Sequence, residues 1–358
     1  MSATPSAAPS VPASAIPSQR TSPAPRHPEH VPQFPPGTDI DQLDPPFLHT
    51  KEQYQKLWDS VDTLLLDCDG VIYHGPIVVP GVKTVLQLAR KQGKQIIFVT
   101  NNGTKSRRMY KKTFDKLGIE AHESEIFGSG YASAVYLSKV LKFPQDKCVY
   151  LLGEKGLEEE LDSVGIKHKG GTDPADNVVL TSPPDFSSFE KDPSVGAVLC
   201  SMDFGINYKK LSKAYSYLRD NPGCEFLLTN QDKVYPTGGT TWVGKLSLAR
   251  RELTPGSGSL SSPLVFALQG KKEPTVVGKP NKPMMDAIIA EHHFDKSRAL
   301  MVGDNQLTDI AFGNNSGIRT LLVLGGVTHE DQVWGPKASD IKPTYVMNSL
   351  GDFATLAE

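Results

Sequence analysis

Five short apolar runs, separated by longer helical stretches, constrain the fold of this chain more than any other feature of its sequence. The runs are Thr63–Leu66, Ile96–Val99, Thr275–Val277, Leu300–Val302 and Thr320–Leu324. Short apolar runs that alternate with helical segments are typical of a parallel sheet with helices on both faces. The sequence therefore predicts an α/β fold whose core is a doubly wound, Rossmann-like parallel sheet.

A second α/β pattern lies between the second and third of these runs. Its predicted strands are Cys148–Leu152, Val195–Cys200 and Glu225–Leu228, and its predicted helices are Glu154–Val164 and Tyr208–Arg219. We therefore expect an inserted α/β cap domain, residues 143–271, within a core formed by residues 46–142 and 272–358. A cap that leaves and rejoins the core near a ligand could exclude water during chemistry.

The first part of the chain has a different composition. Ten of the first 36 residues are proline, and most of the others up to Gly37 are serine, alanine or polar. Such a segment cannot offset its ordering entropy by burial, so we expect residues 1–45 to be a disordered extension. A mitochondrial presequence is the alternative, but Arg20 and Arg26 supply the only Lys or Arg charge, and the prolines would break an amphipathic helix.

The overall composition excludes several classes of function. Lysine and arginine number 38 against 40 acidic residues, so no global basic field exists to bind nucleic acid or an anionic membrane. No stretch approaches the roughly 18 consecutive apolar residues that span a bilayer, and no secretory signal opens the chain. The four cysteines form no C-x-x-C pair, which argues against zinc and disulfides. We expect a cytoplasmic protein with reduced thiols.

Four of the five runs end beside a polar residue that could take part in chemistry. These residues are Asp67, Thr100, Lys279 and Asp304. Ligands of doubly wound sheets bind beyond the carboxyl ends of the strands, which share one edge. We therefore expect the four side chains to meet in one site.

Two carboxylates follow the first run, in Asp67-Cys68-Asp69-Gly70. Side chains at i and i+2 of an extended chain point the same way, so Asp67 and Asp69 could face one phosphorus atom. A carboxylate can attack phosphorus to form an acyl-phosphate, and a second can protonate the leaving alkoxide and later activate water. Gly70 would let the backbone approach the anion. Taken alone, the motif fits equally well a turn that begins with polar residues or the metal clamp of sugar transferases.

Two other motifs could bind phosphate. Thr100-Asn101-Asn102 stands at a strand-to-helix turn, where a hydroxyl and exposed backbone amides suit phosphoryl oxygens. Lys279, fixed before Pro280, could neutralise the nucleophile and the transferring group. Each motif also has a purely structural explanation, because Asn-Asn-Gly is common in loops and lysine is common at protein surfaces.

The last motif brings a second acid pair to a strand end. Asp304, together with Asp67 and the backbone carbonyl of Asp69, could hold Mg²⁺ and leave other positions for water and phosphate. Asp309 lies one helical turn later and is expected to orient Lys279 or a metal-bound water. A charge that merely favours the N-terminus of a helix is the alternative for Asp309.

Together, in this order, the motifs make the chain resemble the haloacid dehalogenase superfamily. Within it, the chain is similar to the branch of phosphoglycolate phosphatase, pyridoxal phosphatase and 4-nitrophenylphosphatase, over about Gln53 to Leu356. The stretches that carry the resemblance are Asp67–Val71, Phe98–Asn102, Gly278–Asn281 and Val302–Asp304, with Tyr150–Gly153 and Leu321–Val327.

The resemblance implies a role for each residue of these motifs. Asp67 would be the nucleophile and Asp69 the acid/base residue, while Asp67, the Asp69 carbonyl and Asp304 would hold Mg²⁺. Thr100, Asn101, Asn102 and Lys279 would bind the substrate phosphate. The inserted domain would be the large α/β cap of that branch, which often mediates a homodimer. The substrate would be a small phosphate monoester such as 2-phosphoglycolate, or the chromogenic 4-nitrophenyl ester.

The segment Thr229–Pro236 resembles the cap loop that faces the substrate in this branch. Pyridoxal phosphatases have histidine at the position of Tyr235, so Tyr235 argues against pyridoxal phosphate. The run Gly238–Leu253 is longer than the connection in the relatives, and we expect it to be a surface insertion.

Two other functions stay open at this point. A phosphoprotein phosphatase of the same branch would differ in its turnover of phosphopeptides. A non-catalytic scaffold would bind partners through the cap and the proline-rich extension, although the catalytic residues of the family are all present.

Overall fold

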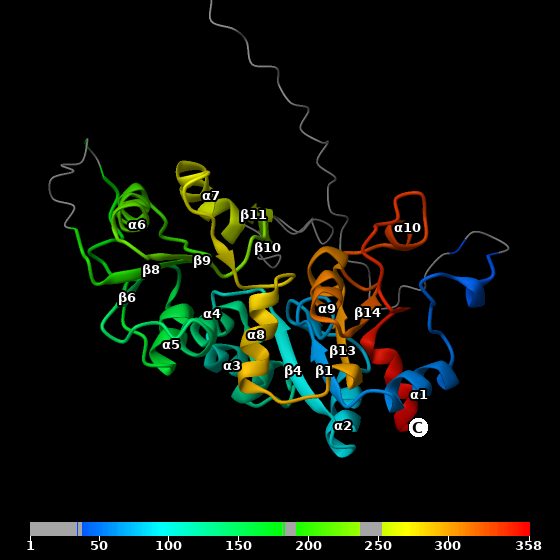
Figure 1. Ribbon diagram of the computed structural model, residues 1–358. Helices are drawn as coiled ribbons and strands as arrows, with labels where there is room; N and C mark the ends of the chain where they lie inside the picture. The colour runs from blue at the N-terminus through cyan, green and yellow to red at the C-terminus, as the bar shows by residue number, and fades with distance from the viewer. Residues whose placement is uncertain (1–33, 35–37, 181, 183–190, 237–252) are drawn as a thin grey trace, which may run out of the picture.

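Figure 1 shows two parallel sheets with helices between and around them, in a computed structural model. The structure describes residues 34, 38–180, 182, 191–236 and 253–358. Residues 1–33 and most of the run Gly238–Leu253 lie outside the described residues, so their disorder and surface position stay predictions. Within the described ranges, no helix is both long enough and apolar enough to span a bilayer.

The first sheet has six strands, and every neighbouring pair is parallel. Its order is β15-β14-β13-β1-β4-β5. The strands are β1 (Thr63–Leu66), β4 (Gln95–Thr100), β5 (Ile126–Gly128), β13 (Ala299–Gly303), β14 (Arg319–Val323) and β15 (Tyr345–Met347). The predicted α/β class with a doubly wound parallel core is thereby confirmed, and four of the five apolar runs belong to this sheet.

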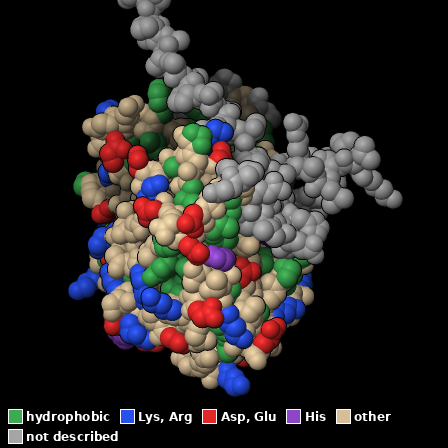
Figure 2. Space-filling model, turned by 90° about the vertical axis from the view of Figure 1, so that its right-hand side faces the viewer, with side chains coloured by type: hydrophobic (Ala, Val, Ile, Leu, Met, Phe, Trp, Pro, Cys, Tyr) green, Lys and Arg blue, Asp and Glu red, His purple; other side chains and the backbone are tan. Residues whose placement is uncertain are grey.

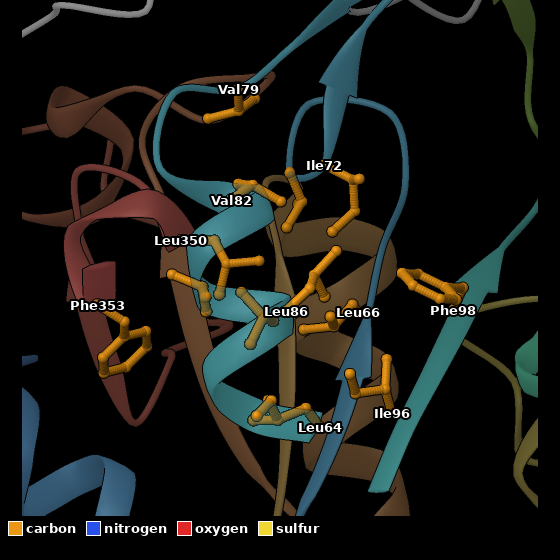
Figure 3. Close-up of a cluster of buried hydrophobic side chains, with 14 of the residues drawn as sticks. Leu64, Leu66, Ile72, Val79, Val82, Leu86, Ile96, Phe98, Leu350 and Phe353 are labelled. Atoms are coloured by element: carbon orange, nitrogen blue, oxygen red, sulfur yellow. The ribbon is translucent and has the colours of Figure 1, made fainter. Parts of the chain in front are cut away.

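Alternate residues of the central strand β1 enter two different apolar cores. Leu64 and Leu66 pack on one face against α2 (Val82–Lys91) and the 3₁₀ helix η7 (Leu350–Ala357), as Figure 3 shows. Leu65 points to the other face. All three leucines are fully buried, which is why the strand reads as a continuous apolar run rather than an alternating one.

Helices cover both faces of this sheet. Besides α2 and η7 they are α1 (Lys51–Asp59), α3 (Arg107–Leu117), α4 (Ser129–Val135), α8 (Lys282–Glu291), α9 (Ala311–Ser316) and α10 (Glu330–Val333), with the short 3₁₀ helices η1 (Ile40–Gln42), η2 (Glu123–Glu125) and η5 (Lys296–Arg298) and the π-helices η3 (Tyr136–Val140) and η6 (Gln306–Ile310). A two-stranded hairpin, β2 (Tyr73–His74) and β3 (Ile77–Val78), follows β1.

The second sheet is built from the segment between β5 and β13. Its five parallel strands have the order β12-β9-β8-β6-β7. They are β6 (Cys148–Leu152), β7 (His168–Gly170), β8 (Val195–Cys200), β9 (Glu225–Leu228) and β12 (Thr275–Val276). The helices α5 (Lys155–Ser163), α6 (Tyr208–Asp220) and α7 (Ser257–Leu268) and the antiparallel pair β10 (Val234–Pro236) and β11 (Leu253–Pro255) complete this part.

One predicted strand belongs to a different sheet from the one expected. The run Thr275–Val277 was assigned to the core sheet, but β12 pairs in parallel with β9 of the second sheet. The pairing continues beyond the strand, since Val277 N donates to Leu228 O (2.9 Å) and Gly278 N to Thr229 O (2.8 Å). Hydrophobicity alone records that a strand is buried and not which neighbour pairs with it. Lys279 consequently enters the core from the cap side.

The two sheets share one apolar layer. A single buried cluster contains Leu65 of β1, Leu151 of β6 and Leu199 of β8, together with residues of α4 and α8. In Figure 1, α4 and α8 lie between the green strands of the second sheet and the blue strands of the first. The cap is therefore held against the core by buried apolar surface as well as by the chain connections.

Part of the predicted N-terminal extension packs on the core. Ile40 and Leu43 adjoin the apolar cluster around Phe47, and the rings of Phe34 and Trp334 are 5.5 Å apart between centroids. Ile40 and Leu43 are apolar, so this part of the chain can offset its ordering entropy by burial. On the face drawn in Figure 2, acidic and basic side chains are mixed and no continuous basic area is visible among the described residues.

Candidate active site

The carboxyl end of β1 places Asp67 and Asp69 in different surroundings. Asp67 N donates to Val302 O of β13 (2.9 Å), so the strand pairing continues to this residue, whose side chain is buried. Asp69 is exposed. Gly70 has φ +94°, and a Cβ there would lie 2.2 Å from Asp304 Oδ2. The turn after the two acids thus requires glycine for both its conformation and its space.

Lys279 links the acids of two strand ends. Its buried ammonium donates to Asp67 Oδ1 (2.6 Å), Asp309 Oδ1 (2.7 Å) and Val99 O (2.9 Å), which satisfies all three of its donors. Burial alone would lower the pKa of Lys279, but the charges of Asp309 and Asp67 outweigh burial and raise the pKa. The side chain is therefore a fixed positive charge beside the buried carboxylates.

Three aspartates gather around this lysine. The structure brings together carboxylate oxygens of Asp67, Asp304 and Asp309, all within 4.8 Å of one another. Asp304 Oδ2 accepts from Val327 N (3.0 Å), and Asp309 Oδ2 accepts from Asn305 N (3.1 Å). Burial raises the pKa of Asp67 well above its usual value; the positive charge of Lys279 opposes this rise, and the negative charges of Asp309 and Asp304 add to it. The single ammonium of Lys279 therefore does not balance the charge of the three carboxylates.

The donor set fits Mg²⁺. Three carboxylates beside one ammonium leave a formal charge of −2, which a divalent cation would balance. Oxygen ligands are those that Mg²⁺ prefers. Of the predicted ligands, Asp67 and Asp304 lie in the cluster. Asp309 lies there as well, hydrogen-bonded to Lys279, as a residue that orients the lysine would be.

The motif after β4 lies against the same lysine. Thr100 is buried, and its Oγ1 accepts from Asn102 N (3.2 Å). Asn101 Nδ2 donates to Lys279 O (3.0 Å). Asn102 uses its side-chain oxygen locally, accepting from the backbone N (3.0 Å) and hydroxyl (2.7 Å) of Thr104. Asn102 therefore shapes the loop with both its side chain and its backbone N–H.

A loop of the cap reaches this motif. Asn230 Nδ2 donates to Asn101 O (2.8 Å), and Asn101 Nδ2 donates to Asp232 Oδ1 (3.3 Å). Farther along, the ring of Tyr235 on β10 contacts that of Phe204 edge-on, with centroids 6.2 Å apart. The segment Thr229–Tyr235 thus lies over the carboxyl edge of the core sheet, where the predicted substrate loop was expected.

Sequence reasoning missed Asn230 and Asp232 as individual residues. Burial, opposed by the hydrogen bond from Asn101 and the charge of Lys279, raises the pKa of Asp232, so this carboxylate belongs electrostatically to the site. The resemblance to a substrate-facing loop singled out Tyr235 alone. The signal available in the sequence was the run of polar residues Thr229–Asp232 directly after the buried strand β9, the same pattern that identified the core motifs.

Family models match two parts of the chain. A haloacid dehalogenase-like hydrolase model matches residues 64–167, and an HAD-hydrolase-like model matches residues 276–353. Between the two matches lies most of the cap sheet. Among curated proteins, a 4-nitrophenylphosphatase of Schizosaccharomyces pombe is 45% identical over 311 residues, covering 87% of this chain and 99% of the relative.

Other relatives extend the same pattern. Phosphoglycolate phosphatase 2 of Arabidopsis thaliana is 42% identical over 315 residues, covering 87% of this chain and 99% of the relative. Among solved structures, p-nitrophenyl phosphatase from Archaeoglobus fulgidus is 28% identical with a TM-score of 0.65, covering 83% of this chain and 99% of the other. The similarity therefore runs through both the core and the cap.

Proposed function

This chain belongs to the haloacid dehalogenase-like hydrolases and is a phosphatase, and from that premise we propose that it hydrolyses small phosphate monoesters through a covalent aspartyl-phosphate on Asp67, with Mg²⁺ as cofactor. The observation that carries the proposal is the buried cluster of Asp67, Asp304 and Asp309 around Lys279. In this proposal Asp67, the Asp69 carbonyl and Asp304 hold the metal, which supplies positive charge for the phosphoryl oxygens.

The first chemical step forms the intermediate. A carboxylate oxygen of Asp67 attacks the phosphorus as the ester oxygen leaves, and Asp69 gives its proton to that oxygen. Lys279 neutralises charge on Asp67 and on the transferring group. Thr100 and the backbone of Asn101 and Asn102 bind the phosphoryl oxygens. The alcohol leaves and Asp67 carries the phosphoryl group.

The second step regenerates the enzyme. Asp69, now a carboxylate, takes a proton from water, and the resulting hydroxide attacks the phosphorus of the aspartyl-phosphate. The bond between phosphorus and the Asp67 oxygen breaks, inorganic phosphate leaves, and both acids return to their starting states. The contact of Asn230 with Asn101 supports a cap loop that keeps other water away from this intermediate.

The substrate class follows from the cap and from the relatives. The cap loop contacts Asn101 beside the acidic cluster, and a loop in this place favours small substrates over folded proteins. Relatives named 4-nitrophenylphosphatase and phosphoglycolate phosphatase resemble the chain along its core and cap. We therefore favour 2-phosphoglycolate and similar small acids, with 4-nitrophenyl phosphate as a convenient substrate. Comparing kcat/KM for phosphoglycolate, pyridoxal phosphate, nucleotides and a phosphopeptide separates these classes.

The cap is also the proposed surface of a homodimer. Phe204, Tyr208 and Phe266, on and beside α6 and α7, expose large apolar side chains. Exposed apolar surface favours association between copies of a chain. Sedimentation of the wild type and of a Phe266→Glu variant tests this surface.

An Asp67→Asn variant tests the proposed function. We expect its hydrolysis of 4-nitrophenyl phosphate to fall to background, because an amide cannot attack phosphorus in this way, while its circular dichroism stays that of the wild type. EDTA should abolish wild-type activity and added Mg²⁺ should restore it. Hydrolysis by the variant at the wild-type rate would exclude Asp67 as the nucleophile.

A further inference from the structure

The cap helix α5 lies directly on the segment that follows the proposed phosphate-binding loop, Thr100–Gly103. At Gly156, in the first turn of α5, a Cβ would lie 2.3 Å from Thr104 O and 2.6 Å from Ser106 N. Two backbone segments approach this closely only where no side chain separates them. The start of α3, which Ser106 Oγ caps by accepting from Met109 N (3.2 Å), therefore rests on the cap.

Two neighbouring glutamates of α5 bond to this helix start. Glu160, whose side chain is 3% exposed, accepts from both the backbone N and the Nε (3.0 Å) of Arg107. Glu159 accepts from Ser106 Oγ (2.6 Å) and from Arg108 Nη2 (2.6 Å). Carboxylates stabilise the N-terminus of a helix, where backbone N–H groups lack partners within the helix. The cap thus supplies the anions that complete the N-terminus of a core helix.

The side chain of Arg107 is fixed between two other helices. Its Cζ lies 3.4 Å from the centroid of the Tyr131 ring on α4, and its Nη2 donates to Ser163 Oγ on α5 (3.1 Å). A guanidinium that stacks on a ring and bonds to a carboxylate has little freedom to move. Because α4 packs against the core sheet, Arg107 also fixes the start of α3 relative to that sheet.

The phosphate-binding loop is also enclosed by the carboxyl edge of the cap sheet. A Cβ at Gly103 would lie 2.7 Å from Ser201 Oγ, after β8, and 3.3 Å from Thr229 Oγ1, after β9. Ser129 Oγ, on α4, donates to Asn101 O (2.6 Å). Parallel sheets of this kind bind ligands beyond the carboxyl ends of their strands. In the cap sheet that position holds the phosphate-binding loop of the core.

Holding the cap to the core does not by itself require the glutamates of α5. The buried apolar cluster that the two sheets share already joins them, and a buried ion pair adds little stability compared with apolar residues of the same size. The glutamates bond to the helix that directly continues the phosphate-binding loop. A shift of that loop by about 1 Å would misplace the groups that bind phosphoryl oxygens, and such a shift can lower the rate about 100-fold.

We propose that Glu160 is a positioning residue for the substrate phosphate: through Arg107 it fixes the start of α3 and thereby the phosphate-binding loop. This inference rests on the proposed function of that loop. Glu160 acts through Arg107 and does not touch the substrate, so no bond or proton changes at Glu160 during the reaction. Every substrate presents the same phosphoryl group, so the contribution of Glu160 is the same for all esters and extends to inorganic phosphate, the product.

Glu160→Gln tests this role, because it keeps the size of the side chain and one acceptor oxygen but removes the charge. We expect the Ki for inorganic phosphate, measured against 4-nitrophenyl phosphate, to rise roughly 10-fold. The kcat/KM should fall by about the same factor for phosphoglycolate and for 4-nitrophenyl phosphate. The Mg²⁺ concentration for half-maximal activity should stay that of the wild type, because the proposed ligands follow β1 and β13 and not α3.

Glu125→Gln is the matched control. Glu125 accepts from Nη1 (2.6 Å) and Nη2 (2.7 Å) of Arg90 and from the backbone N of His122 (2.8 Å). It therefore makes the same kinds of bond as Glu160, to an arginine and to a backbone N–H. It precedes β5, at the amino edge of the core sheet, opposite the site. We expect this variant to lose Tm and to keep the wild-type Ki for inorganic phosphate.

Glu159→Gln decides the question if Glu160→Gln does not fold. The Glu159 side chain is 18% exposed, and its bonds to Ser106 and Arg108 reach the same helix start. Its replacement is therefore the milder change, and we expect the Ki for inorganic phosphate to rise roughly two- to fivefold.

Three results would overturn the inference. The first is a wild-type Ki in folded Glu160→Gln or, where that variant does not fold, in Glu159→Gln. The second is an equal increase of Ki in Glu125→Gln, and the third is a loss of kcat/KM confined to one of the esters. Failure of the proposed function would look different, because in that event wild-type protein hydrolyses none of the esters, or Asp67→Asn hydrolyses them normally.

Discussion

Lys279 Nζ lies 2.6 Å from Asp67 Oδ1, although the two residues are 212 positions apart in the chain. Asp67 follows a strand of the core sheet, and Lys279 follows a strand that pairs within the cap sheet. The ion pair therefore forms only when cap and core are packed together. The charge balance of the buried acidic cluster therefore depends on that packing.

Replacing Lys279 by methionine tests this ion pair. The variant leaves Asp67 and Asp309 buried without their cation, so we expect about 3–5 kcal/mol less stability in EDTA at neutral pH. Activity should fall roughly 10²–10³-fold. Urea unfolding and an assay with 4-nitrophenyl phosphate measure the two effects.

Lys282→Met is the control for the same change. The Lys282 side chain is 74% exposed and pairs with Asp286 one helical turn away, so we expect a loss of at most about 0.5 kcal/mol. Equal effects of the two substitutions would contradict the assigned role of Lys279.

A single methyl group at Gly326 should displace Asp304, the proposed metal ligand. A Cβ at Gly326 would lie 1.6 Å from Asp304 Oδ2, so in Gly326→Ala the carboxylate must move. We expect the affinity for Mg²⁺, measured by isothermal titration calorimetry, to fall roughly 10- to 100-fold.

The neighbouring glycine offers a matched comparison. At Gly325 a Cβ would meet no atom closer than 3.8 Å, so Gly325→Ala should bind Mg²⁺ as the wild type does. Equal binding by the two variants would show that Asp304 is not the ligand.

Magnesium should stabilise the folded protein. A ligand that binds only the folded state at 100 times its dissociation constant adds about 2.7 kcal/mol. We therefore expect Mg²⁺ to raise the Tm of the wild type and EDTA to reverse the rise. Asp304→Asn removes one charged ligand of the cluster, so its Tm should respond weakly. A full response in this variant would place the metal elsewhere.

The contact between cap and core should control substrate binding. Asn230→Ala removes the hydrogen bond from Asn230 Nδ2 to Asn101 O, which costs about 1 kcal/mol, and it frees the loop that carries Asp232. We expect KM for phosphoglycolate to rise several-fold. Asn221→Ala removes two comparable bonds within the cap, to Asp192 O and Val195 O. It should lower Tm and leave KM unchanged; a rise in KM there would argue for a general loosening of the cap.

Asp232 should make the stability depend on pH. Burial raises its pKa above the usual 3.8, so the folded protein binds this proton more tightly than the unfolded chain. Stability from this group is therefore greatest below pH 3.8 and falls as pH rises through the raised pKa. Asp232→Asn removes that fall and keeps an oxygen for Asn101. The variant should be more stable than the wild type at neutral pH in EDTA, by urea unfolding, and lower stability there would contradict the assignment.

The sequence was sufficient to predict the core strands and to predict that the residues at their carboxyl ends lie close together. Leu64, Leu65 and Leu66 read as a buried strand because helices cover both faces. Asp67 and Asp304 had to approach each other because parallel strands share a carboxyl edge. The roles of these acids in catalysis came from the resemblance and stay predictions.

Contacts between distant segments were not predictable in this way. The run at Thr275 gives no sign that it pairs with β9, because pairing partners are chosen by the whole fold. Asp232 has the sequence pattern of a loop residue, and its contact with Asn101 forms only because the cap packs on the core.

Trapping the intermediate tests the central claim most directly. Asp69→Asn should slow the release of phosphate from Asp67, so this variant should accumulate the aspartyl-phosphate when mixed with 4-nitrophenyl phosphate. After acid quench and borohydride reduction, mass spectrometry of the peptides should find homoserine at position 67, and only when substrate was present. Stoichiometric release of 4-nitrophenol with Asp67 unmodified, or with the phosphoryl group on another residue, would contradict the account.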